Sequence, residues 1–121
     1  YTRWGIKELL DARAVDLMQA DTYWAGGISE MVKICHLCAA YDVPIVPHGH
    51  SVPSNVQLSA ALSPVEVPYV EFLVKWNQIL QHFFKDPVLP ENGIIKVPTR
   101  PGMGIEIDPA KVDSEREFTV D

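Results

Sequence analysis

Three side chains capable of acid–base chemistry lie at or near the ends of three successive apolar segments of this sequence. They are Asp21, His48 and Glu71, separated by 27 and 23 residues, and each interval is about the length of one strand–helix unit. A carboxylate beside an imidazole orients the ring and raises its basicity, so the imidazole can take a proton near neutral pH. A second carboxyl group across the pocket, if burial keeps it protonated, can donate to a developing oxyanion.

The elements that must position these residues alternate along the chain. Apolar spacing predicts helices, a glycine-rich loop joins the first strand to the next helix, and short apolar runs predict strands. The predicted helices cover 2–13, 28–41, 51–62 and 76–84, the loop covers 22–27, and the predicted strands cover 14–21, 43–47 and 67–73. Such alternation predicts an α/β fold with a parallel sheet, and ligands bind at the carboxyl ends of parallel strands. The three residues are therefore expected to share one rim.

Each of these residues also has a simpler reading. Asp21 can equally serve as the cap of a following helix, and a histidine after a strand is more often part of the loop. His50 can share the role of His48 on spacing alone, and we expect Gly49 between them to let the chain turn away sharply. Glu71 is harder to explain this way, because a carboxylate within an apolar strand needs a partner or a purpose.

Composition excludes several classes of function. The chain has 121 residues, formal net charge −6 and 47% hydrophobic residues, as in an ordinary single globular domain. A binder of nucleic acid needs a basic patch, and none is visible. No apolar stretch reaches the ~18 residues of a membrane helix. The two cysteines, Cys35 and Cys38, fall within a helical pattern and read as buried core thiols, so we expect a cytoplasmic location.

The chain changes character after Lys85. Residues 86–112 contain five prolines and three glycines, with two short predicted strands at 93–98 and 104–109 around a turn-rich link. This segment belongs to no strand–helix unit and is expected to pack back onto another part of the protein. The polar end, 113–121, is expected to be exposed.

Four motifs together resemble a known family. They are "VDLMQADTYWAGGISEMVKI", "YDVPIVPHGHS", "VEFL" and "PENGIIKVPTRPGMGIEID", and they resemble the C-terminal part of enolase-superfamily enzymes of the mandelate racemase and muconate lactonizing enzyme group. The resemblance is greatest to acid-sugar dehydratases of the L-rhamnonate dehydratase type and extends over nearly the whole chain.

The resemblance implies a fold and a reaction. Residues 1–85 would form the last three units of a (β/α) TIM-type barrel, and residues 86–121 would return to a capping domain absent from this chain. By resemblance Asp21 and His48 match the family's Asp-His dyad, and Glu71 matches the glutamate that hydrogen-bonds the enolic intermediate. The family abstracts the proton α to a carboxylate and eliminates water to give a 2-keto-3-deoxy sugar acid. Trp24 and His50 are expected to contact the substrate.

The resemblance also implies what this chain does not contain by itself. The Mg²⁺ ligands of the family are expected upstream of Tyr1, so no metal ligand is predicted in this chain and the isolated chain is expected to be inactive. The full-length enzyme is expected to bind Mg²⁺ and a small-molecule sugar acid, to contain the missing N-terminal part and to form a homo-oligomer, with no nucleic acid or membrane partner. Two alternatives stay open: a racemase or epimerase of the same superfamily, and a small stand-alone α/β module that binds an anion.

Overall fold

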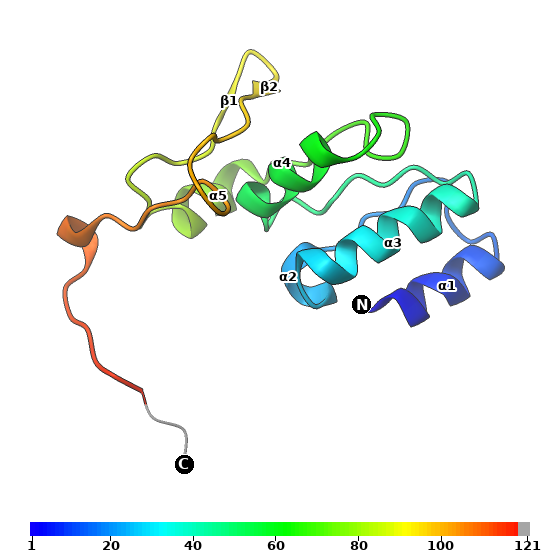
Figure 1. Ribbon diagram of the computed structural model, residues 1–121, viewed down its shortest axis with the longest axis horizontal. Helices are drawn as coiled ribbons and strands as arrows, with labels where there is room; N and C mark the ends of the chain where they lie inside the picture. Colours follow the sequence, from blue (N-terminus) through cyan, green and yellow to red (C-terminus); the bar gives the residue numbers. More distant parts are fainter. Residues whose placement is uncertain (119–121) are drawn as a thin grey trace.

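The computed structural model describes residues 1–118 and contains the predicted helices with small shifts at their ends (Figure 1). In chain order the elements are α1 (Arg3–Asp11), α2 (Thr22–Ala25), α3 (Ile28–Ala40), α4 (Val52–Ala61), α5 (Val74–Leu80), β1 (Pro90–Glu91), β2 (Ile94–Ile95) and the 3-10 turn η1 (Pro109–Lys111). The last predicted helix, found as α5, begins two residues earlier and ends four residues earlier than its apolar pattern predicts, because the chain turns at Gln81–Phe84.

The predicted loop at 22–27 is wrong in its first four residues, which form the single helical turn α2. The Asp21 side chain accepts the backbone N–H groups of Tyr23 and Trp24, which is the geometry of an N-cap. Gly26, with φ of 113°, ends the turn in the left-handed region that glycine adopts without strain. A four-residue turn is too short to show a helical period in the sequence.

The three predicted strands are present as extended segments rather than as a continuous sheet. Met18 and Ile45 form an isolated parallel bridge, flanked by hydrogen bonds from Met18 N to Pro44 O, Val46 N to Met18 O and His48 N to Ala20 O, at 2.9–3.0 Å. Prolines stand at 44, 47 and 68, and proline has no N–H to donate, so the ladder is interrupted.

The third segment runs alongside the second in the same direction. Ile45 N donates to Glu66 O at 2.8 Å, and further along both segments Gly49 N donates to the Glu71 side chain at 2.7 Å. The order of contacts therefore keeps the parallel arrangement expected for an α/β fold. The carboxyl ends of all three segments lie at one edge.

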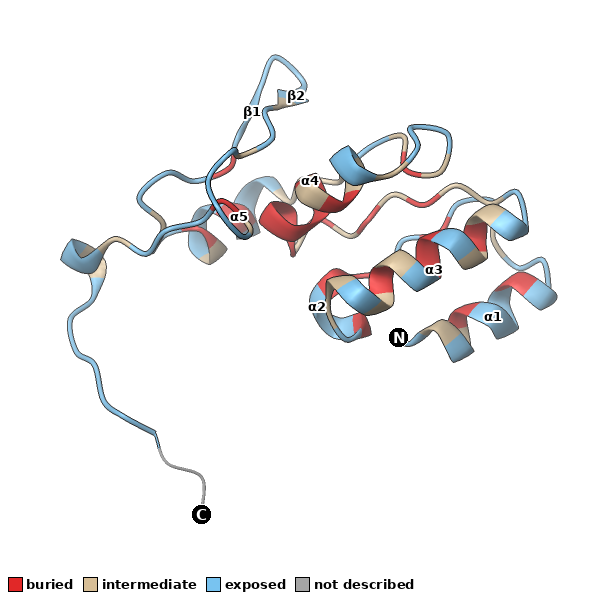
Figure 2. Ribbon diagram, viewed as in Figure 1, coloured by how far each residue is buried: buried red, intermediate tan, exposed pale blue. Residues whose placement is uncertain are grey.

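The main core lies between the helices α1 and α3 and the extended segments (Figure 2). It contains Ile6 and Leu10 of α1, Met31 and Ile34 of α3, and Ile45. Cys35 and Cys38 are also fully buried there, as predicted. Burial raises the pKa of Cys35 to about 12 and that of Cys38 to about 11, which keeps both thiols protonated.

The C-terminal region carries the only paired strands among residues 1–118. β1 and β2 form a two-stranded antiparallel hairpin around Asn92 and Gly93, both of which have positive φ, and an Asn-Gly pair favours such turns. Of the two short strands predicted here, the first is present in part as β2. The second is reduced to one antiparallel bridge between Phe84 and Ile107.

The chain beyond η1 leaves the body of the molecule (Figure 1). Residues 113–118 are exposed, as expected, and the last three residues of that predicted segment lie outside the described residues. Within residues 1–118 the longest helix has 13 residues, and no helix is long and apolar enough to cross a membrane.

Candidate active site

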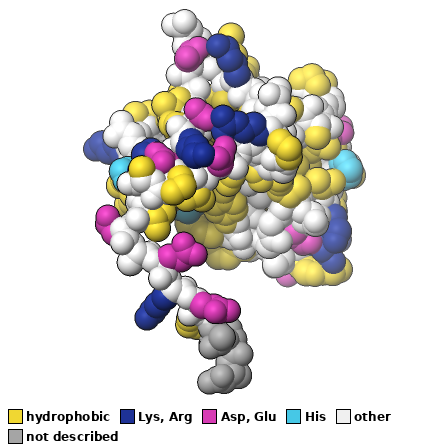
Figure 3. All heavy atoms as spheres, turned by 60° about the vertical axis from the view of Figure 1, so that its left-hand side comes forward, with side chains coloured by type: hydrophobic (Ala, Val, Ile, Leu, Met, Phe, Trp, Pro, Cys, Tyr) yellow, Lys and Arg dark blue, Asp and Glu magenta, His cyan; other side chains and the backbone are white. Residues whose placement is uncertain are grey.

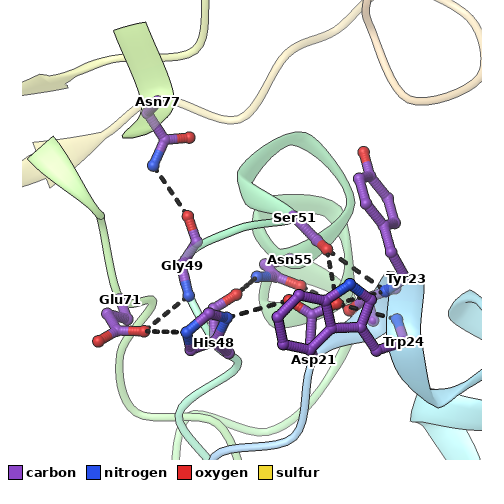
Figure 4. A network of polar contacts seen from close by, with 10 residues as sticks. Asp21, Tyr23, Trp24, His48, Gly49, Ser51, Asn55, Glu71 and Asn77 are labelled. Carbon is purple, nitrogen blue, oxygen red and sulfur yellow. Dashed lines mark hydrogen bonds and ion pairs between the residues drawn. The ribbon is translucent and has the colours of Figure 1, made fainter. Parts of the chain in front are cut away.

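The structure brings Asp21, His48 and Glu71 together at the edge where the extended segments end (Figure 4). Asp21 Oδ2 lies 3.1 Å from His48 Nδ1, and Glu71 Oε2 lies 3.9 Å from His48 Nε2. The imidazole therefore stands between two carboxyl groups, one at each ring nitrogen. The spacing argument predicted this common rim, and the parallel arrangement of the segments is its physical cause.

Asp21 is buried, and its carboxylate accepts hydrogen bonds from several donors. It is 5% exposed, and its Oδ1 accepts from Tyr23 N, Trp24 N and Ser51 Oγ at 2.8–3.1 Å. Burial by itself raises the pKa of Asp21, but the hydrogen bonds from Trp24, His48, Ser51 and Tyr23 together outweigh burial and lower the pKa below its ordinary value. Asp21 is therefore a carboxylate at neutral pH and acts as an acceptor only.

The charge on Asp21 assigns the His48 tautomer. Because the carboxylate can only accept, Nδ1 must carry the proton that lies between the two groups, and in the neutral ring this leaves Nε2 with a free lone pair. The His48 side chain is about one-third exposed. This is the arrangement of a histidine that accepts and returns a proton at Nε2.

Glu71 is held by the backbone of the segment that carries His48. Its Oε2 accepts the Gly49 N–H at 2.7 Å, and the Glu71 side chain is about one-third exposed. The partner that a carboxylate in an apolar segment requires is therefore this peptide group. Glu71 reaches the rim and faces His48 Nε2 from the side opposite Asp21.

Gly49 is required for a reason beyond the expected turn, which the structure contains at residues 49–50. A Cβ atom at this position would lie 2.7 Å from the backbone oxygen of Glu71 and 3.0 Å from Leu73 N, and Gly49 is not among the glycines with positive φ. The two segments approach so closely that only hydrogen fits between them. The chain does turn at Gly49 and His50, as expected, and the close crossing of two backbones is an additional reason for glycine at this position.

Trp24 covers the two histidines. Its ring stacks on His48 with centroids 5.8 Å apart and is tilted over His50 at 5.4 Å, while 56% of Trp24 remains exposed. His50 makes no contact with Asp21 comparable to that of His48, and its buried Nδ1 finds no hydrogen-bond partner within residues 1–118. Of the two histidines, the structure gives the Asp21 contact to His48.

Sequence reasoning missed the polar residues behind the site. Ser51 donates to Asp21, Asn55 donates to His48 O, and Asn77 donates to Gly49 O. Polar residues inside helices have many ordinary explanations, so their types alone gave no signal. Asn77 lies in the same stretch as Gln78, Gln81 and His82, so its polar type did not stand out either.

The residues of this chain do not by themselves fit a magnesium site. Mg²⁺ requires near-octahedral oxygen ligands, whereas within residues 1–118 no three His, Cys, Asp or Glu side chains gather as a metal cluster. Asp21 already accepts from three donors through Oδ1 and faces His48 through Oδ2. Its oxygens are therefore committed to protein groups.

The fold and this site define a class of protein. Residues 1–111 match the family model described as enolase C-terminal domain-like, and the chain belongs to that family. The match covers almost all of the described residues, including Asp21, His48 and Glu71.

The chain is also similar to individual proteins whose activities are named. The arabinonate dehydratase of Saccharolobus solfataricus is 39% identical over 111 residues, covering 88% of this chain and 29% of that protein. The L-rhamnonate dehydratase of Saccharopolyspora erythraea is 32% identical over 127 residues, covering 100% of this chain and 32% of that protein. The D-galactarolactone cycloisomerase of Agrobacterium fabrum is 36% identical over 116 residues, covering 88% of this chain and 31% of that protein. The chain thus spans about a third of the length of these curated relatives, which include dehydratases and a cycloisomerase.

A solved structure agrees with the fold. The crystal structure of L-talarate dehydratase from a Polaromonas species, complexed with Mg and L-glucarate, matches with a TM-score of 0.76 and 28% identity. The match covers 90% of this chain and 28% of that one. The arrangement of helices around parallel extended segments is therefore one that a dehydratase of this superfamily contains.

Proposed function

We propose that this chain supplies the proton-transfer half of the active site of a sugar-acid dehydratase. The observation that supports the proposal most strongly is His48, held at Nδ1 by a buried carboxylate and facing Glu71 across Nε2. The named dehydratases among the relatives support the reaction class. The proposed substrate is a sugar acid with hydroxyl groups at the α and β carbons, similar to L-rhamnonate.

The proposed chemistry uses the two accessible groups. A base from the rest of the full-length protein takes the proton from the carbon α to the substrate carboxylate, and the electron pair of that C–H bond forms a double bond as the bond from the β carbon to its hydroxyl breaks. His48, protonated at both ring nitrogens at this step, donates its Nε2 proton and so turns the leaving hydroxide into water. His48 can also be the base that takes the α proton, in which case the same proton returns at Nε2. Glu71, in its protonated form, donates to the oxygen on which charge develops. The enol product then tautomerises to a 2-keto-3-deoxy acid.

The remaining parts of the site are proposed to come from the rest of the full-length protein. Residues 1–85 would close a (β/α) barrel with strands that this chain lacks, and residues 86–121 would pack against a capping domain. Because the donors in this chain do not fit Mg²⁺, we assign any magnesium ligands to that missing part. Trp24 and His50 are proposed to line the substrate pocket, since both rings lie beside His48.

The test is turnover by the full-length protein. We expect it to convert at least one acid sugar from a panel of arabinonate, L-rhamnonate and their epimers to a 2-keto-3-deoxy acid. We expect the His48→Asn variant to lose about 10³-fold or more in kcat, because the group that moves the proton is removed. Exposed His36, changed to Asn, is the matched control and is expected to leave kcat unchanged.

Three results would contradict the proposal. A His48→Asn enzyme with nearly wild-type kcat would remove His48 from the reaction. Exchange of the α proton with deuterium from D₂O, with inversion at the α carbon and no loss of water, would instead indicate a racemase or epimerase. A full-length protein that binds sugar acids without converting them would favour the anion-binding module.

A further inference from the structure

Three buried amide side chains lie behind the site. Asn55 belongs to α4, Asn77 to α5, and Gln81 follows α5, and they are 0%, 0% and 3% exposed. A buried amide costs free energy unless its donors and acceptor find partners. The hydrogen-bond partners of these three side chains therefore show which parts of the structure they hold in place. We call Asn55, Asn77 and Gln81 the amide set.

The amide set holds the backbone of His48 and Gly49. Asn55 Nδ2 donates to His48 O at 2.8 Å, and Asn77 Nδ2 donates to Gly49 O at 2.8 Å (Figure 4). The two backbone N–H groups are held as well, since His48 N donates to Ala20 O and Gly49 N to Glu71 Oε2. Every polar backbone atom of His48 and Gly49 thus has a partner.

Asn77 and Gln81 have one orientation only. Asn77 Nδ2 also donates to Leu73 O at 3.1 Å, and its Oδ1 accepts from Gln81 Nε2 at 3.0 Å. Gln81 in turn accepts from Val88 N and donates to Val88 O. Rotating either amide by half a turn would place like atoms against fixed backbone groups, so the orientation is set at both ends.

This arrangement connects α5 to the two acid–base groups. Gly49 contacts the Glu71 carboxylate through its N–H and approaches the Glu71 backbone too closely for any side chain. The carbonyl of Gly49 is the atom that Asn77 holds. A shift of the Gly49 backbone would therefore change the separation between His48 Nε2 and Glu71 Oε2, which is 3.9 Å here.

We propose that Asn77, oriented by Gln81, is a positioning residue that fixes the His48–Gly49 backbone and thereby sets the separation between the His48 and Glu71 side chains. Its catalytic consequence rests on the function proposed above. Its structural consequence does not, because it concerns hydrogen bonds between groups of this chain. The two consequences are therefore tested by different measurements.

The structural test is hydrogen–deuterium exchange on the full-length protein. Asn77→Asp keeps the size of the side chain but removes both N–H donors, and Gln78→Glu makes the same change of charge at the exposed neighbouring position. We expect amides 48–51 to exchange about tenfold faster in Asn77→Asp while α3 stays within about twofold of wild type. Gln78→Glu should change neither segment.

The kinetic test uses Glu71. We expect Asn77→Asp to lower kcat about 10- to 100-fold with little change in KM, because misplacement of reacting groups by about 1 Å has effects of this size. In a Glu71→Gln background the same substitution should lower kcat by less than about threefold, since the group it positions is already disabled.

The outcomes separate the two proposals. The positioning proposal is overturned if hydrogen–deuterium exchange accelerates equally in 48–51 and in α3. It is also overturned if the fold-losses of kcat from Asn77→Asp and Glu71→Gln multiply in the double variant. Either result would show that Asn77 has a general structural role. Local acceleration in a protein without dehydratase activity would support the positioning role and contradict the proposed function. If Asn77→Asp does not fold, Gln81→Glu carries the test, because it removes the donor to Asn77 and still accepts from Val88 N.

Discussion

At the scale of single residues, Asp21 performs two roles that the sequence presents as alternatives. It caps α2 through Tyr23 and Trp24, and it holds His48 Nδ1 with its second oxygen. The cap and the contact with His48 use different oxygens of one carboxylate, so neither excludes the other. The helix turn after Asp21 thereby fixes the carboxylate that orients the imidazole.

The lowered pKa of Asp21 gives a stability prediction with a definite sign. Because the pKa is lower in the folded protein than its ordinary value of 3.8, the unfolded chain binds the proton more readily. The stabilisation by this carboxylate is complete above the unfolded pKa and is lost as the pH falls through the folded pKa. We expect Asp21→Asn to lower the free energy of unfolding of the full-length protein by about 1–3 kcal/mol at neutral pH.

The measurement is urea denaturation at several values between about pH 7 and about pH 3. The difference between wild type and Asp21→Asn should shrink toward the acid end, because the wild type loses its charge there. The exposed Asp16, changed to Asn, should show a small difference throughout. A difference that is constant with pH would contradict the assignment of a charged, hydrogen-bonded Asp21.

At the scale of elements, the sequence predicts the helices and the positions of the site residues, because both depend on local patterns of residues. The helices α1, α3 and α4 follow from apolar periodicity, and the positions of Asp21, His48 and Glu71 follow from the spacing of one strand–helix unit. Predicted strands become extended segments with few ladder bonds because prolines remove donors, a loss that apolar patterning does not register. The amide set could not be predicted, since its partners are mostly backbone atoms that come beside these amides only in the folded chain.

The crossing of Gly49 and Glu71 gives a prediction at this scale. We expect Gly49→Ala in the full-length protein to lower the free energy of unfolding by about 1–3 kcal/mol, because the new methyl group would overlap a backbone oxygen rather than a movable side chain. Activity should fall further than stability, since relief of the overlap separates the segments that carry His48 and Glu71. Chemical denaturation and kcat measured on the same variant compare the two effects.

Gly5 offers a matched control. It lies within α1, and outside its chain neighbours and the backbone of that helix no atom lies within 4 Å of the place that an added methyl group would take. Gly5→Ala should therefore stabilise the protein by roughly 0.5–1 kcal/mol through helix propensity. If Gly49→Ala behaves like Gly5→Ala, the close crossing is not the reason for glycine at position 49.

At the scale of the whole molecule, the chain exposes a large amount of apolar surface. Figure 3 shows hydrophobic side chains across one face between charged groups. Large apolar residues on several elements are exposed, among them Trp4, Leu17, Trp76 and Ile79. Exposed apolar surface of this extent, together with extended segments without a full set of ladder bonds, is typical of a surface that packs against other protein.

This surface predicts how the 121-residue chain behaves by itself. We expect it to associate, to bind a dye that reports exposed apolar surface, and to show no dehydratase activity or site-like Mg²⁺ affinity. Size-exclusion chromatography with light scattering and isothermal titration with Mg²⁺ are the measurements. Co-expression with the missing part of the full-length protein should restore a defined particle. A monodisperse chain that melts cooperatively as a monomer would contradict this expectation.

The continuity of the site along the chain has a consequence for recombination between related genes. The hydrogen bonds that arrange Asp21, His48, Gly49 and Glu71 come from one uninterrupted stretch that ends at Val88. A genetic exchange with one crossover on each side of this stretch would transfer these four residues together with the groups that hold them. Recombination between related genes would therefore change the rest of a protein while this hydrogen-bonded arrangement is inherited unchanged.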